Sequence, residues 1–197
     1  MLTTTYEMLQ KAYEGHYAVP AINTQGGTYD IIRAVCMAAE ELRSPVILAH
    51  YVNTGAYSGH DWFYETAKWM ASKVSVPVAI HLDHGDSFER CMEMLKLGFT
   101  SIMFDGSHYP IAENVEKTTE LVKICNEKGL SLEAEVGAIG GEEDGVIGMG
   151  ECADPNECKS IADLGVTMLA AGIGNIHGKY PANWPGLSFE TLAAVKE

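Results

Sequence analysis

Short apolar runs alternate along the chain with segments whose apolar residues recur at helical spacing. In residues 28–42, for example, Ile32, Val35 and Ala39 fall on one helical face. Thr4 and Glu7 match the spacing of a capping box before the first helical segment. Strands are expected at residues 17–23, 46–50, 76–80, 101–106, 130–137 and 167–173. Helices are expected at residues 4–13, 28–42, 62–74, 87–97, 111–128, 155–164 and from 188 onward.

Six strand–helix units in succession predict a parallel α/β sheet. Such a sheet is either doubly wound or a (β/α)₈ barrel. No G-x-G-x-x-G follows any expected strand, which disfavours a dinucleotide-binding sheet. Polar residues instead end at least five strands, as catalytic residues do in barrels. We therefore predict one domain over residues 1–197, an α/β TIM barrel with about six of eight units present. The strand-end residues are Asn23, Asp83 with His84, Asp105, Glu135 and His177.

The stretch from Ala79 to Gly85 carries the densest chemistry. An apolar run leads into His81, Asp83 and His84, and then into Gly85. Imidazole and carboxylate groups are common ligands of divalent metals, and both are costly to bury without partners. Neighbouring strand residues face opposite ways. Asp83 and His84 can therefore serve one site only where the strand breaks, and Gly85 favours such a break.

Composition excludes some classes of function. The formal net charge is −14 and the pI about 4.8, which argues against non-specific nucleic-acid binding. The five cysteines show no metal-ribbon spacing and indicate a reduced protein. No basic leader or long apolar run is visible at the amino terminus, and no run approaches the ~18 apolar residues of a membrane span. We expect a cytoplasmic protein that binds neither nucleic acid nor membrane.

The motifs together resemble the class II, metal-dependent ketose-bisphosphate aldolases, whose best-known members act on fructose and tagatose bisphosphates. The similarity spans essentially the whole chain, and six motifs in the right order are specific where one alone is weak. They lie at residues 17–23, 81–84, 105–108, 133–137, 140–144 and 174–178.

The resemblance implies a metal centre. His84 and His177 match two of the three zinc-binding histidines of the family. Asp105 and Glu135 match carboxylates that hold a second divalent metal position in some members. A monovalent cation near the substrate phosphate is also implied. From the residues alone, Glu135 is equally well a structural carboxylate, and Asp105 a helix cap. His81 is favoured as a neighbour of the site and not as a ligand.

The resemblance also implies a reaction and its substrate contacts. Asp83 matches the acid that protonates the aldehyde oxygen during condensation, and Glu143 matches the base that moves a proton at C3 of dihydroxyacetone phosphate. Asn23 and Gly178 match substrate-binding positions. The implied reaction is reversible, zinc-dependent cleavage of a ketose 1,6-bisphosphate to dihydroxyacetone phosphate and glyceraldehyde 3-phosphate through a metal-stabilised enediolate. The implied partners are this sugar phosphate and further copies of the chain, as a homo-oligomer.

The segment 138–150 is expected to be a loop. Its glycine density is typical of a segment that closes over substrate. Taken in isolation, the run Glu142, Glu143 and Asp144 favours a solvated acidic turn instead.

Two departures from the family pattern bear on function. Tyr51 stands where many relatives carry a small hydroxyl residue, so the sequence does not identify the aldehyde partner. The chain also stops before the seventh strand, which carries the third zinc histidine, and before the eighth. We expect residues 1–197 alone to be poorly soluble or partner-dependent, with negligible aldolase activity. Two alternatives remain: a barrel remnant that binds a metal or a partner without turnover, and a metal-dependent hydrolase.

Overall fold

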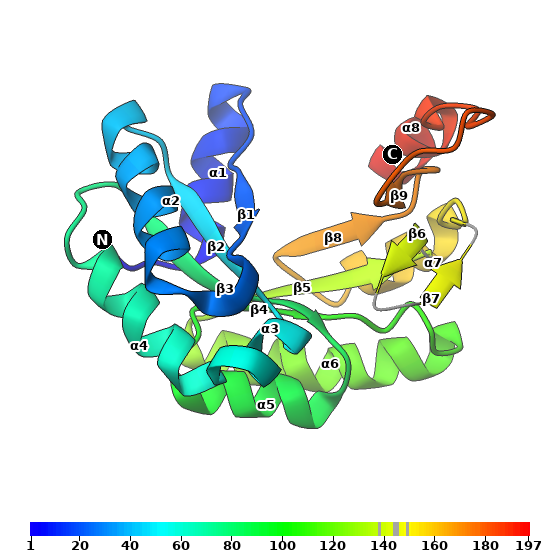
Figure 1. Cartoon of the computed structure of the whole chain (residues 1–197). Coiled ribbons are helices and arrows are strands. Elements are labelled where there is room, and N and C mark those ends of the chain that lie inside the picture. The colour runs from blue at the N-terminus through cyan, green and yellow to red at the C-terminus, as the bar shows by residue number, and fades with distance from the viewer. Residues whose placement is uncertain (138, 144–145, 149) are drawn as a thin grey trace. The chain divides into compact units, whose positions relative to one another are not determined.

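The computed structural model describes residues 1–137, 139–143, 146–148 and 150–197; at residues 25, 140–143 and 146–148 it describes the backbone alone. Its contacts divide the chain into two compact units, residues 1–104 with 124–132, and residues 105–123 with 133–197. Figure 1 labels the helices and strands of both units.

Six strands form one hydrogen-bonded sheet in the order β1-β2-β3-β4-β5-β8. The pairs β1–β2, β2–β3, β3–β4 and β5–β8 are parallel. The prediction of six parallel strands in an α/β chain is therefore confirmed. Their bounds are β1 (Ala21–Asn23), β2 (Val46–Tyr51), β3 (Val78–Gly85), β4 (Ser101–Phe104), β5 (Ser131–Val136) and β8 (Met168–Ala171).

The helices follow the expected pattern with small shifts of their ends. Ser87 caps the helix at 88–97 by accepting a hydrogen bond from the Arg90 amide, and Asp154 caps the helix at 155–162 in the same way. Thr4 is an N-cap, but its side chain makes no capping hydrogen bond, so the predicted capping box is wrong. The helices are α1 (Thr5–Gly15), α2 (Tyr29–Leu42), α3 (Val52–Ser58), α4 (His60–Ala71), α5 (Phe88–Leu97), α6 (Ile111–Lys128), α7 (Pro155–Ala162) and α8 (Phe189–Lys196), with a 3₁₀ turn at Gln25–Gly27.

Two stretches for which the sequence analysis gives neither a helix nor a strand are regular. The segment after β2 forms α3, although Asn53 and Gly55 disfavour a helix. The glycine-rich segment 138–150 contains two short antiparallel strands, β6 (Gly140–Glu143) and β7 (Val146–Gly148). A third strand, β9 (Ile176–His177), pairs parallel with β6. The prediction of an irregular loop there is wrong, because backbone pairing forms these strands without an apolar pattern.

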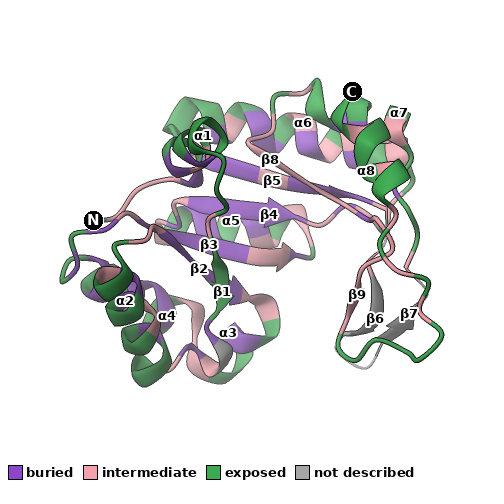
Figure 2. Cartoon of the chain, turned by 90° about the horizontal axis from the view of Figure 1, so that it is seen from above, coloured by how far each residue is buried: buried purple, intermediate pink, exposed green. Residues whose placement is uncertain are grey.

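The core of the first unit is built on β2, β3 and β4. Figure 2 shows these strands largely buried, and the outward side of α2 exposed. Leu48, Ile80 and Leu82 are completely buried, and each such side chain stabilises the fold by about 1.5–3 kcal/mol. Parallel strands covered on both faces read as continuous apolar runs, which explains why the sequence predicted them well. No helix among the described residues is long and apolar enough to cross a membrane.

Candidate metal and substrate site

The end of β3 is irregular where the sequence places its chemistry. The pairing with β4 shifts register between Leu82 and Gly85, and His84 has a φ of 49°. A positive φ is uncommon for a residue other than glycine and marks a local turn of the backbone. At Gly85, an added Cβ would lie 2.3 Å from the Met103 carbonyl oxygen, so glycine is required there. The predicted break is present as a shift within the strand, which continues to Gly85.

Asp83 lies in a polar corner of the first unit. Its Oδ2 accepts a hydrogen bond of 2.7 Å from Asn23 Nδ2, which joins the ends of β3 and β1. Tyr51 lies opposite Asp83 in the register of β2 with β3. The Tyr51 ring meets the His84 ring edge-on, with 6.1 Å between ring centroids. Three predicted site residues thus lie together with Tyr51: the acid Asp83, the substrate residue Asn23 and the metal ligand His84. The Tyr51 side chain fills part of the space at this corner.

The second unit supplies two carboxylates. Asp105 follows β4, and its Oδ1 accepts hydrogen bonds from the Ser107 amide at 3.1 Å and the Ser107 hydroxyl at 2.7 Å. These two bonds form a turn ahead of α6, which begins only at Ile111, so they are not the helix cap that the sequence left open for Asp105. Glu135 lies on β5 and is only 2 % exposed. A carboxylate so buried is stable in its charged form only near cations or strong donors.

Asn114 on α6 holds this part of the second unit together. It is 2 % exposed, its Nδ2 donates to the Glu135 carbonyl oxygen at 3.0 Å, and its Oδ1 accepts from the Thr118 hydroxyl at 3.0 Å. An added Cβ at Gly106 would lie 2.2 Å from Asn114 Oδ1, so Asn114 packs directly against the residue after Asp105. The sequence analysis missed Asn114. Its only signal was a polar pair at i and i+4 on the apolar face of α6.

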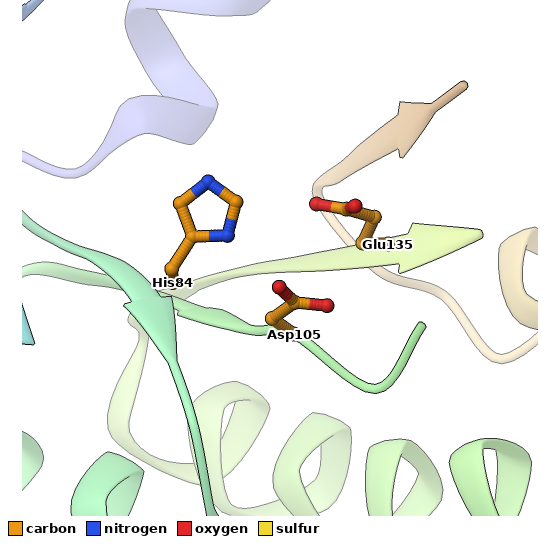
Figure 3. A group of neighbouring side chains, drawn as sticks. All are labelled: His84, Asp105 and Glu135. Atoms are coloured by element: carbon orange, nitrogen blue, oxygen red, sulfur yellow. The ribbon is translucent and has the colours of Figure 1, made fainter. Parts of the chain in front are cut away.

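His84, Asp105 and Glu135 form a group of possible metal ligands. Each offers one ligand atom, and these atoms all lie within 4.8 Å of one another. Figure 3 shows the three side chains converging on one space, from three successive strands of the sheet or their ends. One imidazole nitrogen and two carboxylate oxygens are a donor set that suits a divalent cation such as Zn²⁺ or Mn²⁺.

The remaining predicted site residues lie on the three-stranded sheet of β6, β7 and β9, or beside it. His177 ends β9, where it pairs with Gly141 of β6. It is not a member of the three-residue group. Glu143 ends β6, and its side chain lies outside the described part of the chain. Gly178 has a φ of 77°, and an added Cβ there would meet no atom within 4 Å, so its backbone is accessible.

His81 is buried at 3 % exposure, and its Nδ1 lies 2.8 Å from the Ser101 hydroxyl. It does not belong to the metal-ligand group, in keeping with the role of neighbour that the sequence favoured.

Comparison with known proteins identifies the family of the chain. The family model for class-II fructose-bisphosphate aldolase matches residues 3–197. The fructose-bisphosphate aldolase of Mycoplasma pneumoniae is 48% identical over 198 residues, which are 99% of this chain and 68% of that protein. That of Streptococcus pyogenes serotype M1 is 44% identical over 97% of this chain and 65% of its own length.

Solved structures give the same result. A putative fructose-1,6-biphosphate aldolase from Coccidioides immitis has a TM-score of 0.84 at 35% identity, covering 96% of this chain and 67% of that one. The YdjI aldolase from Escherichia coli K12 has a TM-score of 0.84 at 31% identity, covering 99% and 69%. The chain thus spans about two thirds of the length of these relatives, and the prediction of a TIM-barrel fold is confirmed. The chain belongs to the class II fructose-bisphosphate aldolase family of lyases.

Proposed function

We propose that this chain carries the metal-binding and proton-transfer residues of a zinc-dependent aldolase. The reaction is the reversible cleavage of a ketose 1,6-bisphosphate, of fructose or tagatose type, to dihydroxyacetone phosphate and glyceraldehyde 3-phosphate. The group of His84, Asp105 and Glu135 is the observation that carries the proposal, because its donor set fits a divalent cation.

His84 would hold the zinc ion together with His177, and Asp105 and Glu135 would hold this ion or a second divalent cation. Glu135 supports this assignment, because a carboxylate at 2 % exposure beside a second carboxylate is stabilised by a cation. When bound, the metal acts as a Lewis acid toward the negative charge that carbon–carbon cleavage leaves on the ketone fragment.

Asp83 would hold the proton that moves at the aldehyde oxygen. In the direction of condensation it donates this proton, and in cleavage it takes the proton from the C4 hydroxyl. The 2.7 Å hydrogen bond from Asn23 fixes the orientation of the carboxylate that takes this proton. Asn23 would lie within reach of substrate through the same contact.

Glu143 and Gly178 would serve the ketone fragment. Glu143 would move the proton at C3 of dihydroxyacetone phosphate. The backbone of Gly178 would bind the phosphate of that fragment beside a monovalent cation, as its accessible surroundings allow. We also propose that the protein acts as a cytoplasmic homo-oligomer. The family resemblance supports both the cytoplasmic location and the homo-oligomeric state.

The test is an assay of triose-phosphate release from a panel of ketose phosphates, with Zn²⁺ or with a chelator. The chain is used in excess over substrate, so that a slow single turnover is measurable. Zinc-dependent release from fructose or tagatose bisphosphate, lost in His84→Ala, supports the proposal. Release of inorganic phosphate instead would indicate a hydrolase. Metal binding with no release from any substrate would indicate a barrel remnant without turnover.

A further inference from the structure

Three side chains of the first unit form a hydrogen-bond chain that the proposed reaction does not use. His50 Nε2, at the end of β2, lies 2.9 Å from His60 Nδ1 at the start of α4. His60 Nε2 in turn lies 3.1 Å from Nη1 of Arg90 on α5. His50 is completely buried, and its ring stacks on Phe63 with 3.9 Å between ring centroids. The three side chains therefore join β2, α4 and α5.

Only one arrangement of protons satisfies both hydrogen bonds. A guanidinium group only donates, so His60 Nε2 accepts from Arg90 and carries no proton. A neutral His60 then carries its proton on Nδ1 and donates it to His50 Nε2. His50 must in turn be protonated on Nδ1, an atom that is buried with no hydrogen-bond partner among the described residues. The direction of donation is thus Arg90 to His60 to His50.

The surroundings keep both rings neutral. Burial, with a smaller effect from His60, lowers the pKa of His50 to about 3. Burial, followed by the Arg90 guanidinium, lowers the pKa of His60 below its ordinary range, against the opposing effect of Glu93, Asp61 and Asp86. The proton arrangement derived from the hydrogen bonds is therefore the one present at neutral pH.

The hydrogen-bonded side chains lie near His84 on two sides. Arg90 Nε lies 4.0 Å from Asp86 Oδ1, and Asp86 Oδ1 also accepts from the Ser87 hydroxyl at 3.0 Å. Asp86 is two residues beyond His84, whose backbone has the unusual positive φ. On the other side, His50 precedes Tyr51, whose ring edge meets the His84 ring. His60 therefore lies between two groups of residues that flank His84, one at Asp86 and one at Tyr51.

His60 has little freedom to move. An added Cβ at Gly55 of α3 would lie 1.8 Å from His60 Cε1, so the imidazole packs directly on the backbone of Gly55. Close packing and two hydrogen bonds hold the His60 ring in one orientation. A residue that orients another residue must itself be held in a fixed orientation.

We propose that His60 is a positioning residue for His84. The hydrogen bonds that link Arg90, His60 and His50 fix the turn after β3, and thereby the His84 imidazole that binds the metal. This inference rests on the proposed function. Removing a group that bonds a metal ligand directly costs about 10–100-fold in metal affinity. His60 acts through intervening residues, so we expect a smaller loss of about three- to tenfold.

The first test is the proton arrangement of the 197-residue chain at pH 7.5. Long-range ¹H–¹⁵N correlation spectra separate the two neutral tautomers of each histidine. We expect both His50 and His60 to carry the proton on Nδ1. A proton on Nε2 of His60, or a doubly protonated His60, would overturn the proposal.

The second test compares His60→Asn with His16→Asn. In His60→Asn, the introduced amide N–H can replace Nδ1–H toward His50, but the shorter side chain offers no acceptor at the Nε2 position to Arg90. His16 is exposed and has a φ of 55°, which asparagine tolerates, so His16→Asn is a matched control. In Co²⁺ titrations we expect about three- to tenfold weaker binding for His60→Asn and no change for the control. Equal affinities in folded variants, checked by circular dichroism, would refute the role.

The imidazole signals of His84 give a readout that needs no metal. We expect them to shift in His60→Asn and not in His16→Asn, and unchanged signals would contradict the proposal. If the unmodified chain bound no Co²⁺, the proposed function would fail, while these spectra would still decide whether His60 positions His84.

Discussion

The buried His50 makes the stability of the first unit depend on pH in a predictable way. His50 has a pKa of about 3 in the folded chain, against an ordinary value of 6.5. Below pH 6.5 the unfolded chain therefore binds a proton at His50 that the folded chain does not. Stability is full above pH 6.5, falls as pH drops, and levels off near the folded pKa.

The size of the effect follows from this interval. At about 1.4 kcal/mol per pH unit, the interval from 6.5 to about 3 corresponds to at most about 5 kcal/mol from His50. Between pH 7.5 and pH 5, the expected loss is about 2 kcal/mol, a large part of the ~5–15 kcal/mol that stabilises a typical domain. The lowered pKa of His60 acts in the same direction.

The assay is urea unfolding at pH 7.5, 6 and 5, followed by circular dichroism, for the unmodified chain and for His50→Gln. Glutamine does not titrate, and its amide oxygen can accept the hydrogen bond from His60. Carboxylates titrate alike in both chains and cancel in the difference. We expect His50→Gln to be less stable at pH 7.5 but to lose about 2 kcal/mol less on acidification. Parallel pH profiles within about 0.5 kcal/mol would show that His50 does not stay neutral and buried, and would refute the reasoning.

Three substitutions test the rest of the account. Asp83→Asn keeps the shape and removes the titratable proton, so turnover should fall about 10²–10⁴-fold with zinc content unchanged; loss of zinc by elemental analysis would make Asp83 a ligand instead. Asn114→Ala removes the donor to the Glu135 carbonyl and should cost about 1–3 kcal/mol in urea unfolding; an unchanged midpoint would exclude Asn114 as a brace. Gly55→Ala places a Cβ 1.8 Å from the present position of His60 Cε1. The overpacking should reduce the free energy of unfolding by about 1–3 kcal/mol and so lower the thermal midpoint. A midpoint equal to that of the unmodified chain would show that His60 is free to move.

The strands and the end of β3 were predictable from sequence because burial on both faces leaves a continuous apolar run. The run before His81 identified β3, and the polar residues after it identified the site. The break at Gly85 was also predictable, since glycine fits where the Met103 carbonyl approaches closely.

Other features have no local signal in the sequence. The strands β6 and β9 are short, β6 begins with two glycines, and their pairing depends on segments more than 30 residues apart. Asn114 and His60 act through contacts with residues distant in sequence, and a single polar side chain in a helix does not reveal such contacts. The Thr4 capping box failed because matching residues make the bond possible but do not ensure its geometry.

Zinc binding by the chelator-stripped 197-residue chain, measured by calorimetric titration beside His84→Ala, tests the central claim most directly. The account predicts that the unmodified chain binds Zn²⁺ through His84, together with His177 and the carboxylates of Asp105 and Glu135, and that His84→Ala loses this binding while remaining folded by circular dichroism. A folded chain that binds no Zn²⁺, or a His84→Ala variant that binds it equally well, would contradict the account.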